Sequence, residues 1–218
     1  MCYNPTISIL TFSIISLASL YLFFRNYPND RWFACLFMSA GIMQLLEFFI
    51  WIDTKCGRLN HIVSLLTYIL LMLQPIIVLI AAYFFGNITF NKKYLLPVIF
   101  GYVVIFGIII AIAIKKSCGI KLCTQPAKHL NWPLQKLYSG KFLFYLSWAL
   151  YFLAILILFF AKPIIPAIVI FVLLIGSLIF SIAFVKEASW KSFWCWIVNF
   201  IPIIYIGITY YKFNQTSK

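Results

Sequence analysis

Long apolar runs separated by short polar breaks are the main pattern along this chain. A membrane-spanning helix needs about 20 consecutive apolar residues, and runs of that length recur from one end of the sequence to the other. The predicted helices are residues 5–24, 32–52, 61–85, 94–114, 142–161, 163–185 and 192–211. Irregular backbone cannot face lipid, so each run is predicted to be a helix. The expected fold class is all-α, a polytopic membrane bundle of about seven transmembrane helices.

The polar breaks divide this bundle without separating it into domains, so residues 1–218 are predicted to form a single transmembrane domain. The weakest break is Lys162-Pro163. Pro163 and Pro166 suit the first turn of a helix, where proline loses no hydrogen bond; if this break fails, six helices remain. Residues 115–141 form the one substantial loop, which contains cysteine, histidine, proline and tryptophan.

Composition favours the same class. Hydrophobic residues make up 65% of the chain and charged residues 10%, whereas soluble domains have roughly 45–50% and ~25%. The net charge of +13 comes from 17 Lys and Arg against 4 Asp and Glu. These basic residues lie at the ends of apolar runs, where they snorkel to anionic headgroups. The expected partner is therefore the lipid bilayer and not nucleic acid.

The basic residues give conflicting predictions of orientation. If the amino terminus is outside, the cytoplasmic side carries Arg25, Arg31, Lys92, Lys93, Lys162, Lys212 and Lys218, and the opposite side carries the other ten. That count favours an amino terminus inside. The first helix, however, has flanking charges only after it, which favours an amino terminus outside. We expect the latter.

Candidate chemistry centres on Glu47, the one acid inside a predicted span. Gln44, Glu47 and Trp51 share a helix face at i, i+3, i+7 spacing. The next predicted helix carries a polar stripe with the same periodicity: Asn60, Ser64, Thr67 and Gln74. A short loop joins the two helices, so they are expected to pack antiparallel with their polar stripes facing each other.

Two interpretations of this cluster stay open. Ionisable residues within the membrane often mark ion, proton or substrate pathways, so Glu47 predicts a site for a cation, a proton or a small polar solute. Alternatively, a protonated Glu47 is an interhelical clasp, bonded to Gln74 or Thr67.

Two prolines predict bends near these polar residues. Pro75 follows Gln74, and Pro202 comes three residues after Asn199. Proline within a helix removes a backbone hydrogen bond, and broken helices often line transporter sites. The Pro-Ile-Ile segments at both prolines are followed by paired aromatics at the same offset. This similarity indicates a 3+1+3 internal repeat, with chance as the other explanation.

Enzyme motifs are missing from the sequence. Both histidines, His61 and His129, lie at loops, and no Gly-x-Ser-x-Gly, phosphate loop or Cys-x-x-Cys occurs. We therefore predict no metal, no cofactor and no catalytic residues.

The cysteines bear on the redox compartment. Cys56, Cys118 and Cys123 are predicted to lie on one side of the membrane. If that side is outside, Cys56 can bridge to either of the others, or those two to each other; if inside, they are free thiols. Cys35 and Cys195 are predicted to be buried apolar residues.

Four motifs carry a resemblance: the opening Met1-Cys-Tyr-Asn-Pro-Thr-Ile-Ser8, then Gln44-Leu-Leu-Glu47-Phe-Phe-Ile-Trp51, Leu73-Gln-Pro75 and His129-Leu-Asn-Trp132. Together they resemble an uncharacterised family of small multi-pass proteins of giant DNA viruses, protists and algae. The resemblance implies seven helices and a viral or host membrane, and it brings no known activity.

The leading functional hypothesis is a small transporter or channel-like protein with its polar core between the second, third and seventh helices. The alternative is a non-catalytic scaffold or receptor-like module that uses residues 115–141 as its contact surface.

Overall fold

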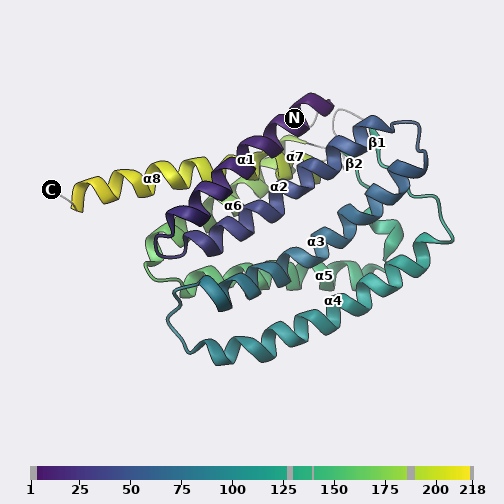
Figure 1. Cartoon of the computed structure of the whole chain (residues 1–218). Coiled ribbons are helices and arrows are strands. Elements are labelled where there is room, and N and C mark those ends of the chain that lie inside the picture. Colours follow the sequence, from purple (N-terminus) through teal and green to yellow (C-terminus); the bar gives the residue numbers. More distant parts are fainter. Residues whose placement is uncertain (1–3, 127–129, 139, 186–189, 217–218) are drawn as a thin grey trace.

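The computed structural model describes residues 4–126, 130–138, 140–185 and 190–216, and helices make up most of it (Figure 1). Its α-helices are α1 (Pro5–Arg25), α2 (Asp30–Ile52), α3 (Arg58–Phe85), α4 (Leu95–Ser117), α5 (Lys141–Ile155), α6 (Ile164–Phe184), α7 (Trp190–Val198) and α8 (Ile201–Thr216). Three 3-10 helices, η1 (Lys92–Tyr94), η2 (Leu134–Leu137) and η3 (Leu156–Phe160), and two short strands, β1 (Gln125–Pro126) and β2 (Leu130–Asn131), complete the described part.

The first four helices pack in chain order, and the later ones do not. α1 packs against α2 and α2 against α3, and α3 also contacts α4 and α5. On the other side, α6 contacts η3, α7 and α8, and α8 returns to α1. Figure 1 shows α2 and α3 passing through the bundle between its outer helices. The polar residues of α2 and α3 therefore lie where a site inside the bundle would be.

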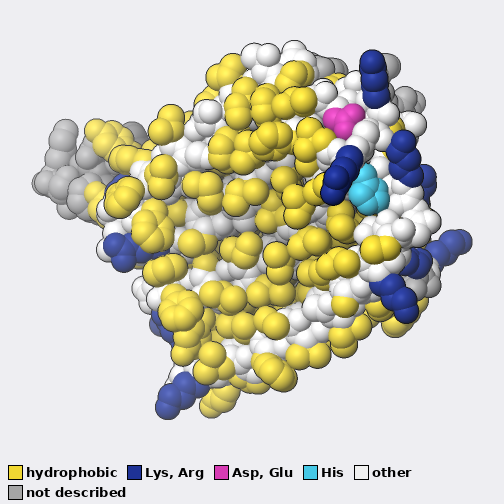
Figure 2. Space-filling view, turned by 45° about the vertical axis from the view of Figure 1, so that its right-hand side comes forward, with side chains coloured by type: hydrophobic (Ala, Val, Ile, Leu, Met, Phe, Trp, Pro, Cys, Tyr) yellow, Lys and Arg dark blue, Asp and Glu magenta, His cyan; other side chains and the backbone are white. Residues whose placement is uncertain are grey.

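The surface of the bundle matches a lipid environment. In the described residues, seven helical segments are long and apolar enough to cross a membrane, with α7 and α8 together forming the last. Figure 2 shows hydrophobic side chains covering the middle of the molecule and Lys and Arg gathered towards its edges. The predicted all-α class is confirmed, and the chain is an integral, multi-pass membrane protein.

The break predicted at Lys162-Pro163, the weakest in the sequence, is present between η3 and α6. Pro163 precedes the first residue of α6 in an extended conformation, and the loop around it is hydrogen-bonded to two others. Lys162 N donates to Asn87 O over 2.7 Å. Asn29 Nδ2 donates to Lys162 O over 2.9 Å, and Asn29 Oδ1 accepts from Asn87 N over 2.7 Å. The buried Asn29 amide thus joins three loops at this end of the bundle.

The last predicted helix differs, because residues 192–211 belong to two helices. α7 ends at Val198 and α8 starts at Ile201, so Pro202 occupies the second position of α8. A proline there lacks an N–H that the helix would not have bonded. Pro202 therefore marks a break and does not bend a continuous helix, whereas Pro75 does lie inside α3.

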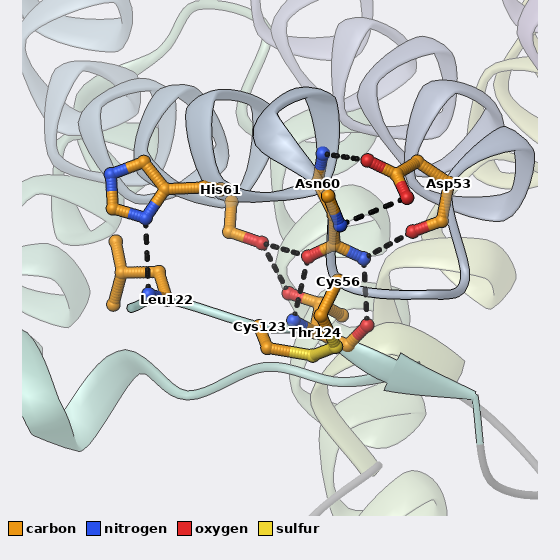
Figure 3. The surroundings of a disulfide bond; sticks show 9 residues. Asp53, Cys56, Asn60, His61, Leu122, Cys123 and Thr124 are labelled. Carbon is orange, nitrogen blue, oxygen red and sulfur yellow. Dashed lines mark hydrogen bonds between the residues drawn. A yellow bond between two sulfur atoms is a disulfide. The ribbon is translucent and has the colours of Figure 1, made fainter. Parts of the chain in front are cut away.

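At the opposite end, a disulfide bond fixes the long loop to the bundle. It joins Cys56 to Cys123 with a Cα–Cα distance of 5.2 Å, while Cys118 is a free, exposed thiol. Next to the disulfide, β1 and β2 pair antiparallel. Leu122 N donates to His61 Nδ1 over 3.0 Å (Figure 3). The loop is therefore a folded cap on α3.

Asn60, the third residue of α3, is the centre of this cap. Its amide pairs with Thr124, donating to Thr124 O over 3.0 Å and accepting from Thr124 N over 2.9 Å. Asp53 accepts from the backbone N–H groups of Asn60 and Gly57, each over 3.0 Å. These two backbone bonds hold the pKa of Asp53 below its usual value.

The cysteine pairing is tested by electrophoresis. We expect the purified wild-type protein to migrate faster without reductant, because the Cys56–Cys123 bond closes a large loop. Cys56→Ser and Cys123→Ser should abolish the difference, whereas Cys118→Ser should keep it. A shift lost in Cys118→Ser would contradict the pairing.

Candidate functional site

Glu47 lies wholly inside the bundle, and its side chain is 0% exposed. Gln44 Nε2 donates to Glu47 Oε2 over 3.0 Å, as the i, i+3 spacing on α2 predicts. Cys195 of α7 lies close enough to interact electrostatically with Glu47, and α2 and α7 are in contact. The Gln44–Glu47 pair therefore has α7 as a neighbour, a helix far away in the sequence.

Gln74 on α3 connects two other helices. Its Nε2 donates to Ser39 O of α2 over 3.2 Å, and its Oε1 accepts from Tyr151 OH of α5 over 2.8 Å. A mostly apolar cavity of about 30 Å³ lies here, with Gln74, Tyr151 and Cys195 in its wall. About 10–15 Å³ of such volume holds one water, so this space accepts only about two or three.

Pro75 lies in α3 directly after this contact. It has no N–H to donate to the carbonyl of Leu71, so the helix lacks one hydrogen bond at the level of the cavity. Gln74 and the cavity thus lie directly beside Pro75, and the bend that the sequence predicts at this proline stays a prediction.

The rest of the polar stripe of α3 makes other contacts. Thr67 Oγ1 donates to Val63 O of its own helix over 2.9 Å. Ser64 Oγ lies 2.7 Å from Thr124 Oγ1, so it joins Asn60 in holding the loop. The stripe thus has two parts with different contacts. Asn60 and Ser64 hold the loop, whereas Gln74 binds α2 and α5.

Asn199 is the most unusual polar residue of the interior. It lies in the turn between α7 and α8 and is 1% exposed. Neither Nδ2 nor Oδ1 has a hydrogen-bond partner among the described residues. Each buried polar group left unpaired costs about 1–3 kcal/mol. Asn199 directly follows the end of α7, the helix that contacts α2.

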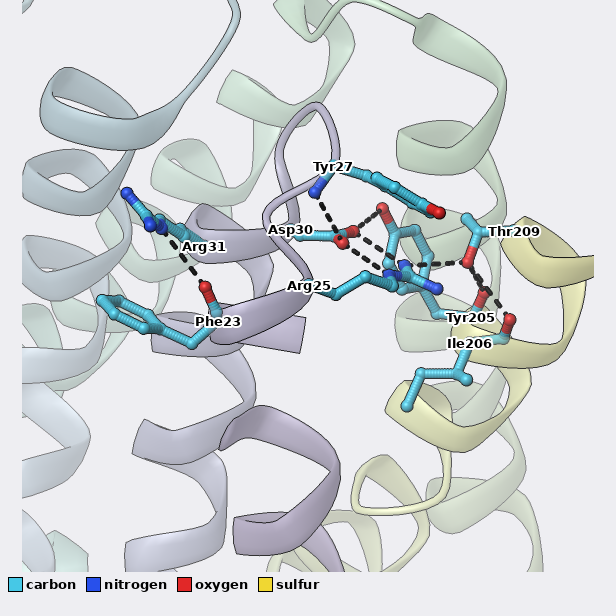
Figure 4. Close-up of polar contacts among 8 residues, drawn as sticks. All are labelled: Phe23, Arg25, Tyr27, Asp30, Arg31, Tyr205, Ile206 and Thr209. Carbon is cyan, nitrogen blue, oxygen red and sulfur yellow. Dashed lines mark hydrogen bonds and ion pairs between the residues drawn. The ribbon is translucent and has the colours of Figure 1, made fainter. Parts of the chain in front are cut away.

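A buried ion pair near the loop between α1 and α2 is absent from the sequence-based prediction. Asp30 is 0% exposed and binds Arg25 through two contacts, Nε–Oδ2 of 2.7 Å and Nη2–Oδ1 of 2.9 Å. Tyr205 OH donates to Asp30 over 3.0 Å, and Arg25 Nη2 donates to Thr209 Oγ1 over 2.9 Å (Figure 4). This network joins α1, α2 and α8.

The omission has a physical reason. The prediction starts the second helix at Trp32 and leaves Asp30 in a polar loop, but α2 starts at Asp30. Glu47 is therefore not the one acid in a spanning helix. The signal was present, because an acid in the first turn is favoured by the helix dipole.

Comparisons with protein-family models, curated proteins and solved structures found no match. The fold thus defines the class, a multi-pass α-helical membrane protein. Cys2 and His129, which carry part of the family resemblance, lie outside the described residues.

Removing the carboxylate of Asp30 tests the importance of the ion pair. Asp30→Asn leaves the Arg25 guanidinium buried without its anion, and breaking such a pair costs about 3–5 kcal/mol. We expect that loss in the free energy of unfolding, measured in detergent. Tyr205→Phe, which removes one hydrogen bond to the same carboxylate, should cost about 1.5–3 kcal/mol. Equal stability of Asp30→Asn and wild type would contradict the role of this pair.

Proposed function

We propose that this chain is a small transporter or channel-like protein, which passes a small polar solute or an ion between α2, α3 and α7. The observation that carries the proposal is the buried Asn199 amide, which lacks a partner in the described residues at a helix break. Glu47 and Gln44 on α2 and Gln74 on α3 complete the set.

The cost of these groups supports a ligand role. If the interior of the bundle served packing alone, the protein would be more stable with apolar residues of similar size in place of Glu47 and Asn199. Interrupted helices in transporters expose polar groups to their substrates at the middle of the membrane. The turn at Asn199 provides such an interruption.

The narrow cavity indicates a closed conformation. Its volume of about 30 Å³ excludes anything much larger than water. Transport therefore requires the helices to move, and the helical hydrogen bonding is interrupted at Pro75 and at the turn before Pro202. Both lie next to the polar residues of the proposed path.

The proposal includes an orientation. Disulfides persist in oxidising compartments, and Cys56 and Cys123 lie at the end of the bundle where α1 starts, since α1 and α2 are antiparallel neighbours (Figure 1). The disulfide therefore supports the proposal that the amino terminus is outside. The proposal also includes a location in a viral or host membrane, as the family resemblance implies.

Flux through proteoliposomes tests the proposal. The wild-type protein should raise proton flux, reported by a trapped pH-sensitive dye, or glycerol uptake, measured by vesicle swelling, above that of empty liposomes. Glu47→Gln and Asn199→Leu should each lower this flux at least about tenfold, because they remove polar groups from the path.

Thr67→Val is the matched control. It removes a buried hydroxyl that bonds its own helix, and it should leave the flux unchanged. Wild-type flux equal to that of empty liposomes would contradict the proposal for these probes. Unchanged flux in both Glu47→Gln and Asn199→Leu would show that these two residues do not contribute to the path.

The second candidate, a scaffold, is favoured by the fixed conformation of the disulfide-bonded loop, since a preorganised surface binds at lower entropic cost. Replacing residues 118–140 by a flexible linker discriminates the two. A transporter should keep its flux, and a scaffold should lose its partner in pull-downs.

A further inference from the structure

A second cavity lies outside the proposed path, between the long loop and the start of α7. Its volume is about 350 Å³, and it contains polar side chains from the strand pair, from η2 and from α7. The residues that matter are Gln125, Asn131, Trp132, Gln135, Lys136 and Lys191. Small-molecule sites typically have volumes of roughly 300–1,000 Å³, so this cavity has room for a ligand.

Lys191 is a buried cation in its wall. It is 6% exposed, and its Nζ lies 5.4 Å from the centroid of the Trp190 ring. No carboxylate of the described residues forms an ion pair with it. Burying a charge is costly unless an opposite charge accompanies it. Lys191 therefore favours an anion in the cavity.

The acids of the chain have other roles or lie elsewhere. Asp30 binds Arg25, Glu47 binds Gln44 inside the bundle, and Asp53 binds the backbone of Asn60. Glu187, the fourth acid of the sequence, lies outside the described residues. The described part of the chain thus offers no carboxylate to balance the cavity's lysines.

Trp132 gives an independent indication. This residue is 4% exposed and lines the cavity, and its Nε1 is buried without a hydrogen-bond partner among the described residues. An indole N–H can only donate. The exposed amides of Gln125, Asn131 and Gln135 and the ammonium of Lys136 add further donors at the same cavity. All these groups suit an acceptor-rich, negatively charged ligand.

We propose that this cavity binds a phosphate group. Phosphate oxygens accept several hydrogen bonds at once, and lysine is a common point-charge partner for phosphate. The last spanning segment starts at Trp190, so the cavity lies at the boundary of the membrane, where phospholipid headgroups are found. The ligand is therefore a lipid phosphodiester or a free phosphate anion that approaches from water.

Binding to the full-length protein tests this site in two arms. In the first, delipidated protein in detergent is titrated calorimetrically with inorganic phosphate. In the second, protein from nanodiscs of phosphatidylcholine with or without phosphatidylglycerol is examined by native mass spectrometry for retained lipid. Binding in either arm supports the site and identifies the source of the phosphate. Binding in neither overturns it.

Variants locate the site. Lys191→Gln and Lys136→Gln should each weaken binding roughly tenfold, because each removes a charge-assisted contact. Trp132→Phe keeps an aromatic side chain and removes the indole N–H, and it should weaken binding several-fold. Lys136 is exposed, so its variant is expected to fold even if Lys191→Gln does not.

Lys121→Gln is the matched control, since it removes one exposed lysine from the same loop without touching the cavity. It should bind like the wild type. If Lys121→Gln weakens binding as much as Lys136→Gln, the attraction is a general effect of positive charge and the site is wrong. Unchanged binding in both Lys136→Gln and Trp132→Phe would also overturn it.

Discussion

Hydrocarbon offers no hydrogen bonds, and this constraint accounts for most of the polar contacts in the bundle. Each buried polar group must find its partner within the protein or carry a free-energy cost. The two ends of the molecule meet this requirement in different ways. At one end, Arg25 and Asp30 neutralise each other while binding Tyr205 and Thr209. At the other, the amide of Asn60 pairs with Thr124 next to the disulfide. Both arrangements join segments that are distant in sequence, so they determine which helices are neighbours.

Between these two ends, dispersion and small residues hold the helices, because lipid tails are as apolar as the side chains they replace. Few polar side chains lie between the two ends of the bundle, and they differ in whether they have hydrogen-bond partners. Gln74 has partners on α2 and α5 and so contributes to packing. Asn199 has none in the described residues. Glu47 lies near α7, which α8 follows after a turn. The contrast between the satisfied Gln74 and the unsatisfied Asn199 is the reason for placing a path on the α7 side of the interior.

The sequence was sufficient to locate the helices along the chain. It was insufficient to predict how each helix is rotated about its own axis. Apolar runs and the proline after Lys162 located the spanning segments, because length and hydrophobicity are set by the bilayer. Which face of α2 meets which neighbour was not predictable, since lipid-facing and protein-facing positions are both apolar. The expectation that the polar stripes of α2 and α3 face each other rests on chain order, and for Glu47 it stays a prediction. Asp30 was missed, and the turn at Asn199 was predicted only as a bend at Pro202, for a related reason. One extra polar residue at a helix end, or one break inside an apolar run, hardly changes hydropathy. The 3+1+3 repeat and the family resemblance stay predictions.

The phosphate cavity bears on the conflict over orientation. Counting charges places the side with ten basic residues in the cytoplasm, whereas the disulfide between Cys56 and Cys123 favours an oxidising compartment for the same side. The counting rule treats every lysine near a span as a free charge that resists translocation. Lys191 is buried against Trp190, and Lys136 shares its cavity. If both hold a phosphate and are set aside, the count falls from ten against seven to eight against seven, and the charge argument against an amino terminus outside becomes weak. Chemical labelling of the free thiol of Cys118 from outside intact cells would therefore test the orientation independently, because labelling is expected only if this loop is external.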